Sequence, residues 1–249
     1  GKVVSPVATY RELFGHPVWR KHALLGLALA CSGVIGLWAV GFYVPDLTRQ
    51  VQTKPVTAAV YAAEIEAAKA AGDTVRVAAL QEVQQAVNTN AVEGLSAELQ
   101  AVKKTVDPKI KGRLTYYQSF SSIAINIGAF CGMFGFGALS QRIGRKPTFA
   151  MALVAAFVST VTVFWTLQDL WQIFVLVPIM GFCQLSLFGG YAVYFPELFP
   201  TRLRSTGVSF CYNVGRFVAA VGPLVKLWLN EVFKETPEPL RYAGVTMCL

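Results

Sequence analysis

The sequence predicts an all-α fold: a polytopic transmembrane helix bundle with a helical extramembrane insertion. Two apolar runs, residues 118–140 and 147–168, contain no Asp, Glu, Lys or Arg. Each run is long enough to cross about 30 Å of hydrocarbon as a helix. Hydrophobic residues make up 54% of the chain and charged residues 14%, which is typical of a membrane protein rather than of a soluble domain.

The first half of the chain contains one predicted span and the insertion. Residues 1–22 are polar and form an N-terminal segment, and the apolar run 23–44 predicts a transmembrane helix. Pro45 and Asp46 follow at once and end the apolar run. Residues 45–115 are rich in Ala, Glu and Gln and contain no apolar run long enough to cross a membrane, so they form the extramembrane insertion.

The second half, residues 116–249, is expected to form the rest of the bundle. Transmembrane spans are predicted at about 117–139, 147–167, 170–195 and 206–230, with the start of another at 242. Because the chain begins with Gly1 and its last apolar run stops at Leu249 after too few residues to span, we expect a fragment of a longer protein.

The insertion has the pattern of packed helices. Residues 46–113 carry nearly equal numbers of acids and bases. Apolar residues recur there at helical spacing: Leu80, Val83, Val87, Leu95, Leu99 and Val102. Asn88, Asn90 and Gly94 predict a break between two helices. One interpretation is a solvated helical insertion that packs on the bundle or on a sister copy, and the alternative is a dedicated site for a ligand or partner.

The distribution of charge predicts the orientation in the membrane. The N-terminal segment and the turns near 140–146 and 196–205 are rich in Lys and Arg, whereas the turns near 168–170 and 231–241 carry more acids than bases. Short positively charged segments are retained in the cytoplasm. We therefore expect a multi-pass protein of the cell (plasma or inner) membrane, with a cytoplasmic N-terminus and a non-cytoplasmic insertion.

Two sequence motifs lie on the predicted cytoplasmic side. Residues 137–146 read Gly-Ala-Leu-Ser-Gln-Arg-Ile-Gly-Arg-Lys: the glycines permit close packing and a tight turn, and cations are favoured at a helix C-terminus beside lipid. Residues 196–207 read Pro-Glu-Leu-Phe-Pro-Thr-Arg-Leu-Arg-Ser-Thr-Gly, and Pro196 and Pro200 are expected to stop the preceding helix. The acid of this second motif lies within reach of its own arginines and can also pair with the cations of the first.

These motifs predict a cytoplasmic gate that opens and closes as charged groups exchange partners. The alternative is that the cations only anchor the chain at the cytoplasmic face. The residues of the predicted gating motif are Gly137, Gln141, Arg142, Gly144, Arg145, Lys146, Glu197, Arg202 and Arg204.

The first motif resembles the signature cytoplasmic loop of the major facilitator superfamily of secondary transporters, Gly-x-Leu-x-Asp-Arg-x-Gly-Arg-Arg/Lys. The second is similar to the Pro-Glu-x-Phe-Pro-Thr-x-x-Arg-x-x-Gly segment that follows the tenth helix in sugar-porter-like and metabolite–proton-symporter-like members. The resemblance implies half of a twelve-helix fold: helices seven to eleven and the start of twelve. Gln141 stands where the signature has Asp, so the family's charge-paired latch lacks its carboxylate here.

Arg216 is the most unusual residue of the predicted spans, because it lies about ten residues into the span 206–230. An unpaired cation at that depth is costly, so it faces a cavity or a partner, and no Asp or Glu occurs within the spans. Structural pairing and contact with a substrate are both open. Tyr212 and Asn213 share its helical face.

The candidate substrate-pathway residues are Arg216, Asn213, Tyr212, Asn126, Gln184 and Trp38. Hydrogen bonding between helices is the alternative role for the two mid-span amides, and core packing or lipid contact is the alternative for the tryptophan.

The resemblance implies a secondary active transporter that moves a small organic solute, a sugar or an organic acid, by alternating access. Ion coupling, with a proton as the candidate ion, follows from the family's tendencies. The implied partners are the solute, the lipid bilayer and the missing N-terminal half of the same transporter. The alternative is a non-transporting membrane scaffold or receptor whose insertion, residues 46–113, binds a partner.

Other classes of function lack support in the sequence. The cations are dispersed rather than gathered in a stripe with aromatic residues, so we expect no nucleic-acid partner. The five cysteines have no metal-ligand spacing, the two histidines lie near the N-terminus, and no Walker loop occurs. We therefore expect no metal site, no cofactor and no enzymatic activity.

Overall fold

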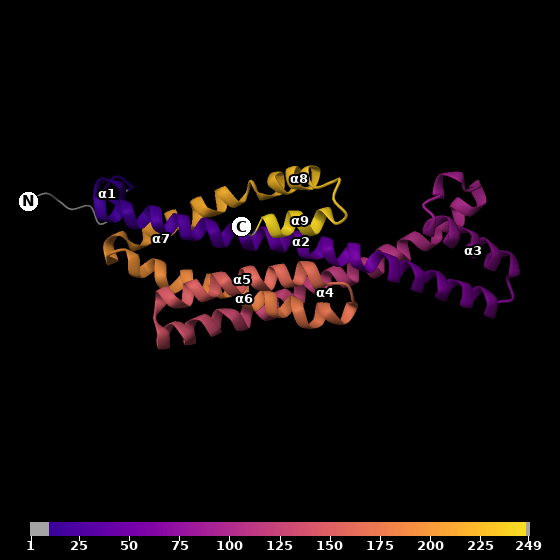
Figure 1. Cartoon of the computed structure of the whole chain (residues 1–249), viewed down its shortest axis with the longest axis horizontal. Coiled ribbons are helices and arrows are strands. Elements are labelled where there is room, and N and C mark those ends of the chain that lie inside the picture. The colour runs from indigo at the N-terminus through magenta and orange to yellow at the C-terminus, as the bar shows by residue number, and fades with distance from the viewer. Residues whose placement is uncertain (1–9, 248–249) are drawn as a thin grey trace, which may run out of the picture. The chain divides into compact units, whose positions relative to one another are not determined.

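The computed structural model describes residues 10–247, and for residues 35–42 it describes the backbone only. Within these residues the regular elements are helices, as the sequence predicts (Figure 1). They are α1 (Tyr10–Gly15), α2 (Pro17–Ala70), α3 (Thr74–Asn88), the 3-10 turn η1 (Val92–Gly94), α4 (Ala97–Ile143), α5 (Arg145–Thr166), α6 (Leu170–Leu198), α7 (Thr201–Ala219), α8 (Gly222–Val232) and α9 (Pro239–Thr246). Four described segments are long and apolar enough to cross a membrane: α4, α5, α6, and α7 with α8. The predicted span 23–44 lies in α2 and includes residues 35–42, so it stays a prediction.

The chain divides into two compact units. A bundle unit contains the described residues among 1–47, 121–167 and 171–249, and an insertion unit contains residues 48–120 and 168–170. Both α2 and α4 contribute residues to each unit. Helix α2 therefore continues through Pro45, beyond the end of the predicted span 23–44. A proline removes one backbone hydrogen bond but does not forbid a helix whose flanks are packed, and Leu47 just beyond it is fully buried.

Helices α4 and α6 pack so closely that their backbones touch. A Cβ atom on Gly128 or Gly132 of α4 would overlap the carbonyl group of Pro178 or Phe182 of α6. Gly181 of α6 meets the backbone of α4 in the same way. Small residues at these positions allow the dense helix packing on which association within a membrane depends.

Helix α2 packs against α6 and α7 around an aromatic core. Tyr191 of α6 is fully buried, stacks on Phe195 with ring centroids 4.9 Å apart, and donates a hydrogen bond of 2.8 Å to the carbonyl oxygen of Leu29 of α2. A Cβ on Gly215 of α7 would lie 3.3 Å from the Cβ of Ala30. These contacts position α7, which carries the candidate arginine, directly against α2.

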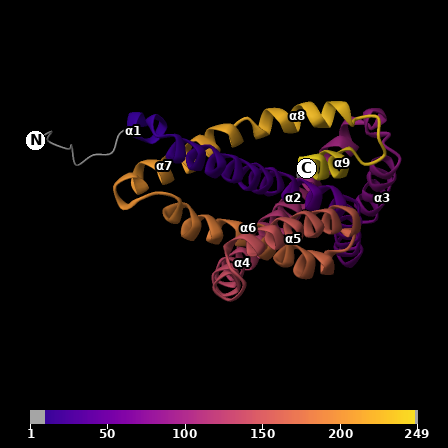
Figure 2. The same cartoon turned by 60° about the vertical axis from the view of Figure 1, so that its left-hand side comes forward.

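Helix α9 packs against the C-terminal end of α5, and the two helices are in contact. Arg241 of α9 is only 9% exposed and donates hydrogen bonds to the carbonyl oxygens of Phe164 (2.6 Å), Trp165 (2.9 Å) and Leu167 (3.0 Å). The last carbonyl groups of a helix have no partner within the helix. The guanidinium therefore caps α5 and is favoured by the negative end of its dipole. Helices α8 and α9 also run side by side in both views (Figures 1 and 2).

The insertion unit has a hydrophobic core of its own. Tyr61 of α2, Leu80 of α3 and Val106 of α4 are fully buried in it. The Asp73 side chain caps the start of α3 by accepting a 2.9 Å hydrogen bond from a backbone N–H in the first turn. The predicted break between helices is confirmed: α3 ends at Asn88, Asn90 adopts a positive φ of 55°, and η1 follows before α4 begins.

Candidate substrate pathway and cytoplasmic gate

Arg216 lies on α7 and its side chain is exposed in the bundle unit. The guanidinium carbon lies 6.0 Å from the centroid of the Tyr212 ring, one helical turn earlier. Asn213 is also exposed and donates a 2.9 Å hydrogen bond to the hydroxyl of Ser209. The structure thus brings together the three polar residues that the sequence placed on one helical face. No carboxylate pairs with Arg216 in the described part of the chain.

The helix breaks immediately after this group, within the candidate membrane span Thr201–Val232, which agrees with the predicted span 206–230. Helix α7 ends at Ala219 and α8 begins at Gly222. Pro223 has no backbone N–H, so it cannot donate the helical hydrogen bond to the Ala219 carbonyl. The Val221 N–H bonds instead to the Val218 carbonyl, three residues back, at 3.2 Å. Irregular backbone inside a span is tolerated where it is buried in protein or lines a water-filled cavity.

Lys226 is a functional candidate that sequence reasoning missed. It lies on α8, beyond the break, and forms an ion pair with Asp46 of α2. Its ammonium nitrogen lies 4.8 Å from the centroid of the Tyr43 ring, so it also makes a cation–π contact. Lys226 falls inside the predicted span 206–230, and a census of every ionisable residue in the spans would have found it. Asp46 lies two residues beyond the predicted end of its own span.

The two mid-span amides have different surroundings. Gln184 of α6 is 6% exposed and its amide nitrogen donates a 2.5 Å hydrogen bond to the Thr160 hydroxyl of α5, so it has the position of an interhelical hydrogen bond. Asn126 of α4 is exposed and lines an open groove of about 430 Å³ with Ile123 and Phe130. Nothing in the described structure joins either amide to the α7 group. The Trp38 side chain lies outside the described residues.

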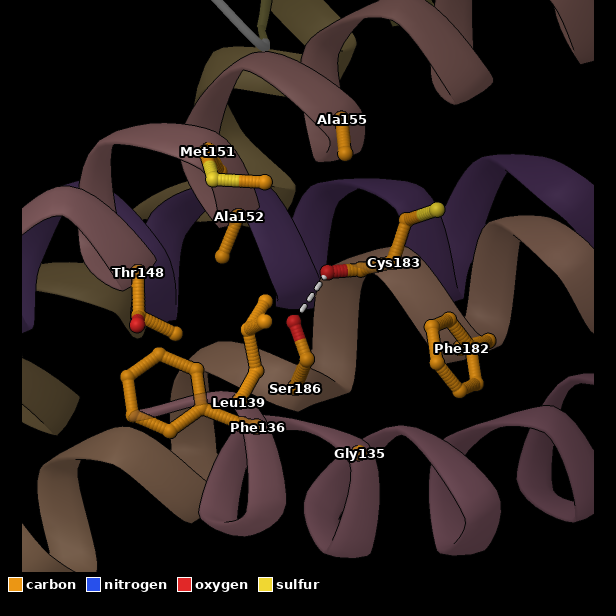
Figure 3. A pocket seen from close by; sticks show the side chains of 10 residues that line it. All are labelled: Gly135, Phe136, Leu139, Thr148, Met151, Ala152, Ala155, Phe182, Cys183 and Ser186. Carbon is orange, nitrogen blue, oxygen red and sulfur yellow. Dashed lines mark hydrogen bonds between the residues drawn. The ribbon is translucent and has the colours of Figure 1, made fainter. Parts of the chain in front are cut away.

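A small pocket lies between α4, α5 and α6 (Figure 3). Its volume is about 160 Å³, below the range of about 300 to 1,000 Å³ that is typical of small-molecule sites. The Ser186 hydroxyl donates to the Cys183 carbonyl at 2.7 Å, as the dashed line in Figure 3 shows, and the Thr148 hydroxyl donates to the Gly144 carbonyl at 2.7 Å. Both hydroxyls are thus bonded within their own chain segments. The pocket presents mainly apolar walls and is not a candidate for a polar solute.

The two motifs predicted to lie on the cytoplasmic side meet through one ion pair. The Arg145 guanidinium donates two hydrogen bonds to the Glu197 carboxylate, at 2.8 and 3.3 Å, and a third to the Ser140 hydroxyl at 2.8 Å. Gly144 just before it has a φ of 91°, which a side chain would resist, so the predicted tight turn is present. The hydrogen bonds from Arg145 lower the pKa of the Glu197 carboxyl below its ordinary value. Both groups lie outside the predicted spans.

The other members of the gating motif lie apart from this pair. Arg202 pairs with Glu12 of α1, and Arg204 donates a 3.0 Å hydrogen bond to the Pro196 carbonyl, so neither arginine reaches Glu197. Gln141, Arg142 and Lys146 are exposed and have no ion pair or hydrogen-bond partner among the described side chains, and nothing packs within 4 Å of a Cβ placed on Gly137.

The proline prediction for the second motif was only partly right. Helix α6 continues through Pro196 to Leu198, because a proline in the last turn of a helix removes only one backbone hydrogen bond. The helix has ended before Pro200, which directly precedes α7. This places the carboxylate of the second motif on the final turn of α6, opposite the first residue of α5.

Residues 112–247, more than half of the chain, match the sequence profile described as Major Facilitator Superfamily. The chain belongs to this superfamily. The match confirms the resemblance carried by the two cytoplasmic motifs. Four described segments suited to cross a membrane and a helical bundle agree with a multi-pass membrane protein of this family.

Several transporters share sequence with this superfamily member. It is 36% identical over 93 residues to a probable 4-methylmuconolactone transporter of Cupriavidus pinatubonensis, covering 37% of this chain and 22% of the relative. It is 36% identical over 88 residues to a cis,cis-muconate transport protein of Acinetobacter baylyi, covering 35% and 21%. It is 33% identical over 125 residues to a glycine betaine/proline/ectoine/pipecolic acid transporter of Dickeya dadantii, covering 49% and 25%. The chain thus spans only about a quarter of the length of these relatives. No solved structure matches it.

Proposed function

We propose that this chain forms one half of a secondary active transporter that moves a small carboxylated organic solute by alternating access. The observation that carries the proposal is the exposed Arg216, which has no carboxylate partner in the described structure and stacks on Tyr212. A guanidinium offers a planar fork of donors that matches a carboxylate in a bidentate geometry. The sequence leaves sugar and organic acid open, and this group favours the acid.

The arrangement around Arg216 suits a site that binds and then releases its solute. Tyr212 holds the guanidinium over its ring, which reduces the conformational freedom that binding must remove. Helix α7 ends three residues after Arg216, where the break before α8 begins, and discontinuous helices are common at transporter binding sites. The names of the relatives agree with this class: muconate is a dicarboxylate, and proline and betaine each carry one carboxylate.

The cytoplasmic ion pair supplies the gate of this proposal. Arg145 and Glu197 join α5 to α6, and both are partly exposed, with side-chain exposures of 30% and 48%. A partly exposed pair of this kind contributes little free energy to stability, so it can open when the two halves rock. We propose that the pair holds the cytoplasmic side of this half in one of its two arrangements.

The proposal also includes the membrane orientation, the second half of the transporter and the coupling ion. The bundle lies in the cell membrane with its N-terminus in the cytoplasm, and the second half of the transporter covers the exposed polar face of α7. Coupling to an ion, with a proton as the candidate, needs a carboxylate that changes protonation. The described spans of this chain lack an acid at mid-depth, so the coupling carboxylate is expected in the other half.

A panel of labelled solutes tests the proposal. Membrane vesicles that contain the full-length protein are incubated with labelled cis,cis-muconate, L-proline, glycine betaine or glucose, one solute at a time. We expect uptake of at least one carboxylated solute, inhibition of that uptake by other carboxylates, and no uptake of glucose. Uptake of glucose that carboxylates do not inhibit would contradict the assignment of solute class.

The alternative, a membrane scaffold or receptor, is favoured by the separate hydrophobic core of the insertion unit. Deleting residues 57–105 and joining the ends with a short flexible linker separates the two functions, because loop length costs little closure free energy. We expect the shortened protein to enter the membrane and to keep part of its transport activity. Complete loss of transport at normal membrane abundance would favour the alternative.

A further inference from the structure

The insertion unit contains a pocket that the proposed pathway does not use. It has a volume of about 280 Å³ and lies between α2, α4 and the turn 168–170, and all of its walls belong to the insertion unit. Its polar walls are formed by Gln52, Arg113, Tyr117, Gln168 and Asp169. We call it the outer pocket. Its size is close to the lower end of the range for small-molecule sites, about 300 Å³.

Gln52 distinguishes the outer pocket from a packing defect. Its side chain is 3% exposed, yet it makes no hydrogen bond to any residue in the described part of the chain. Its amide lies on the wall of the outer pocket, where it can bond to water or to a ligand. The other α2 residues on the wall, Pro55, Val56 and Ala59, are apolar, so Gln52 is the polar group that α2 offers to a ligand.

Arg113 and Asp169 give the outer pocket one charge of each sign. Arg113 of α4 is exposed and has no ion-pair partner among the described residues, so its guanidinium is available to a carboxylate. Asp169 directly precedes α6 and is held by a contact of its own within the chain. Tyr117 is half-buried and packs against the insertion core, so its ring has a fixed position on the wall.

We propose that the outer pocket binds a small zwitterionic solute. The solute carboxylate lies on Arg113, with Gln52 as a second hydrogen-bond partner, and its cationic nitrogen lies towards Asp169 and Tyr117. A dicarboxylate would place its second negative group near Asp169, and a neutral sugar would leave the guanidinium unpaired. An aromatic ring is also a favourable neighbour for a cationic nitrogen.

Under the predicted orientation the outer pocket opens on the non-cytoplasmic side, where it would hold a solute before that solute reaches α7. This role in transport rests on the proposed function. Binding of a solute in the outer pocket does not rest on the proposed function, because the two arginines belong to different units. Arg113 lies on α4 within the insertion unit, and Arg216 lies on α7 within the bundle unit. The two sites can therefore be tested separately.

Saturation-transfer NMR on the purified full-length protein in detergent, with L-proline as the probe, tests the proposal. We expect saturable binding in which Arg113→Gln raises the dissociation constant about tenfold or more, because a charge-assisted hydrogen bond is lost. Lys111→Gln is the matched control: it removes an exposed cation of the same helix that does not line the pocket, and it should change the constant less than twofold. Gln52→Leu should weaken binding without changing any charge.

Two further variants show whether proline binds in the outer pocket or at Arg216, and whether the outer pocket prefers a zwitterion to a dicarboxylate. Arg216→Gln should leave proline binding within twofold of the wild type, and Asp169→Asn should weaken proline binding and strengthen that of cis,cis-muconate. Equal dissociation constants of proline for Arg113→Gln and Lys111→Gln would overturn the proposal. Loss of proline binding in Arg216→Gln would also overturn it. A phosphatidylethanolamine headgroup carries the same two charges, so proline binding that disappears when this lipid is added would identify the headgroup as the occupant and refute the solute assignment. Arg113-dependent binding without uptake of any solute would refute the proposed function alone.

Discussion

Lys226 of α8 and Asp46 of α2 form an ion pair that ties the segment beyond the helix break to the first long helix. The lysine side chain is 19% exposed and the aspartate 44% exposed, so the pair is only partly desolvated. Arg216 lies on the other side of the break. A change at the break therefore alters the position of one cation relative to the other, and the ion pair limits that change.

Removing one partner of this pair is expected to destabilise the bundle unit. Lys226→Met leaves a partly buried carboxylate without its cation, and we expect a loss of about 1–3 kcal/mol, between the values for exposed and buried pairs. Lys234→Met is the control, because its ion pair with Glu231 is largely exposed and should contribute less than about 1 kcal/mol. Denaturant unfolding in detergent measures both. Additive losses in the double variant Lys226→Met/Asp46→Asn would show that the two residues do not interact.

The close contact of α4 with α6 predicts a contrast between two glycines of the same helix. Gly128→Ala would drive a methyl group into the Pro178 carbonyl, whereas a Cβ on Gly137 meets nothing within 4 Å. We expect Gly128→Ala to lower the unfolding free energy by about 1–3 kcal/mol through overpacking, and Gly137→Ala to leave it unchanged or raise it by up to about 1 kcal/mol. Thermal unfolding of both variants in detergent provides the comparison. Equal stability of the two variants would mean that the helices do not approach this closely.

The cytoplasmic ion pair predicts a change in accessibility when its acid is neutralised. Glu197→Gln removes the partner of Arg145, so Ser209→Cys on α7 should react faster with an impermeant maleimide in inside-out vesicles. Glu98→Gln, an exposed acid of the insertion, is the control and should have no effect. Equal labelling rates in the Glu197→Gln and Glu98→Gln variants would show that the ion pair of Arg145 with Glu197 does not act as a gate.

The same pair has a defined pH dependence. Because hydrogen bonds from Arg145 lower the pKa of Glu197, its contribution is complete above the ordinary Glu pKa and is lost as the pH falls through the lowered value. Labelling of the Ser209→Cys protein should therefore stay constant from pH 8 down to about pH 5, above the ordinary Glu value. A rise in labelling near neutral pH would point to a different titrating group.

The orientation predicts which positions an impermeant reagent can reach. In a cysteine-free background, Asn90→Cys in the insertion should be labelled from outside intact cells, and Ile143→Cys within the first motif should not. The reason is the retention of short basic segments in the cytoplasm. The reverse labelling pattern would invert the topology and place the insertion in the cytoplasm.

Composition and short motifs were enough to predict the helical class, the approximate positions of four spans and the turn at Gly144, because each depends on local properties of the chain. The continuation of α2 through Pro45 could not be predicted in this way, since it depends on the packing of residues beyond the proline. The same is true of the partners of charged groups. The sequence allows Glu197 to pair with the arginines of its own motif or with the cations of the first, and only the folded chain shows that its partner is Arg145, 52 residues away.

The candidate sites, too, could be predicted from the sequence only where they depend on spacing along one helix. Depth in a span identified Arg216, and helical periodicity placed Tyr212 beside it, because both follow from spacing along one helix. The outer pocket needs α2, α4 and a short turn to meet, and its members are separated by more than 50 residues in sequence. Only the folded chain shows that Gln52 and Arg113 line one cavity.

The uptake kinetics of Arg216 variants test the central claim most directly. For a carboxylated solute we expect Arg216→Gln to raise the KM about tenfold or more and Arg216→Lys to raise it less, because lysine keeps the charge but loses the planar fork. Membrane abundance should stay normal, and Lys21→Gln, which removes an exposed cation outside the predicted spans, should have no effect. A wild-type KM in Arg216→Gln, or an equal fall in maximal rate for every solute with no change in KM, would contradict a role for Arg216 in binding the carboxylate.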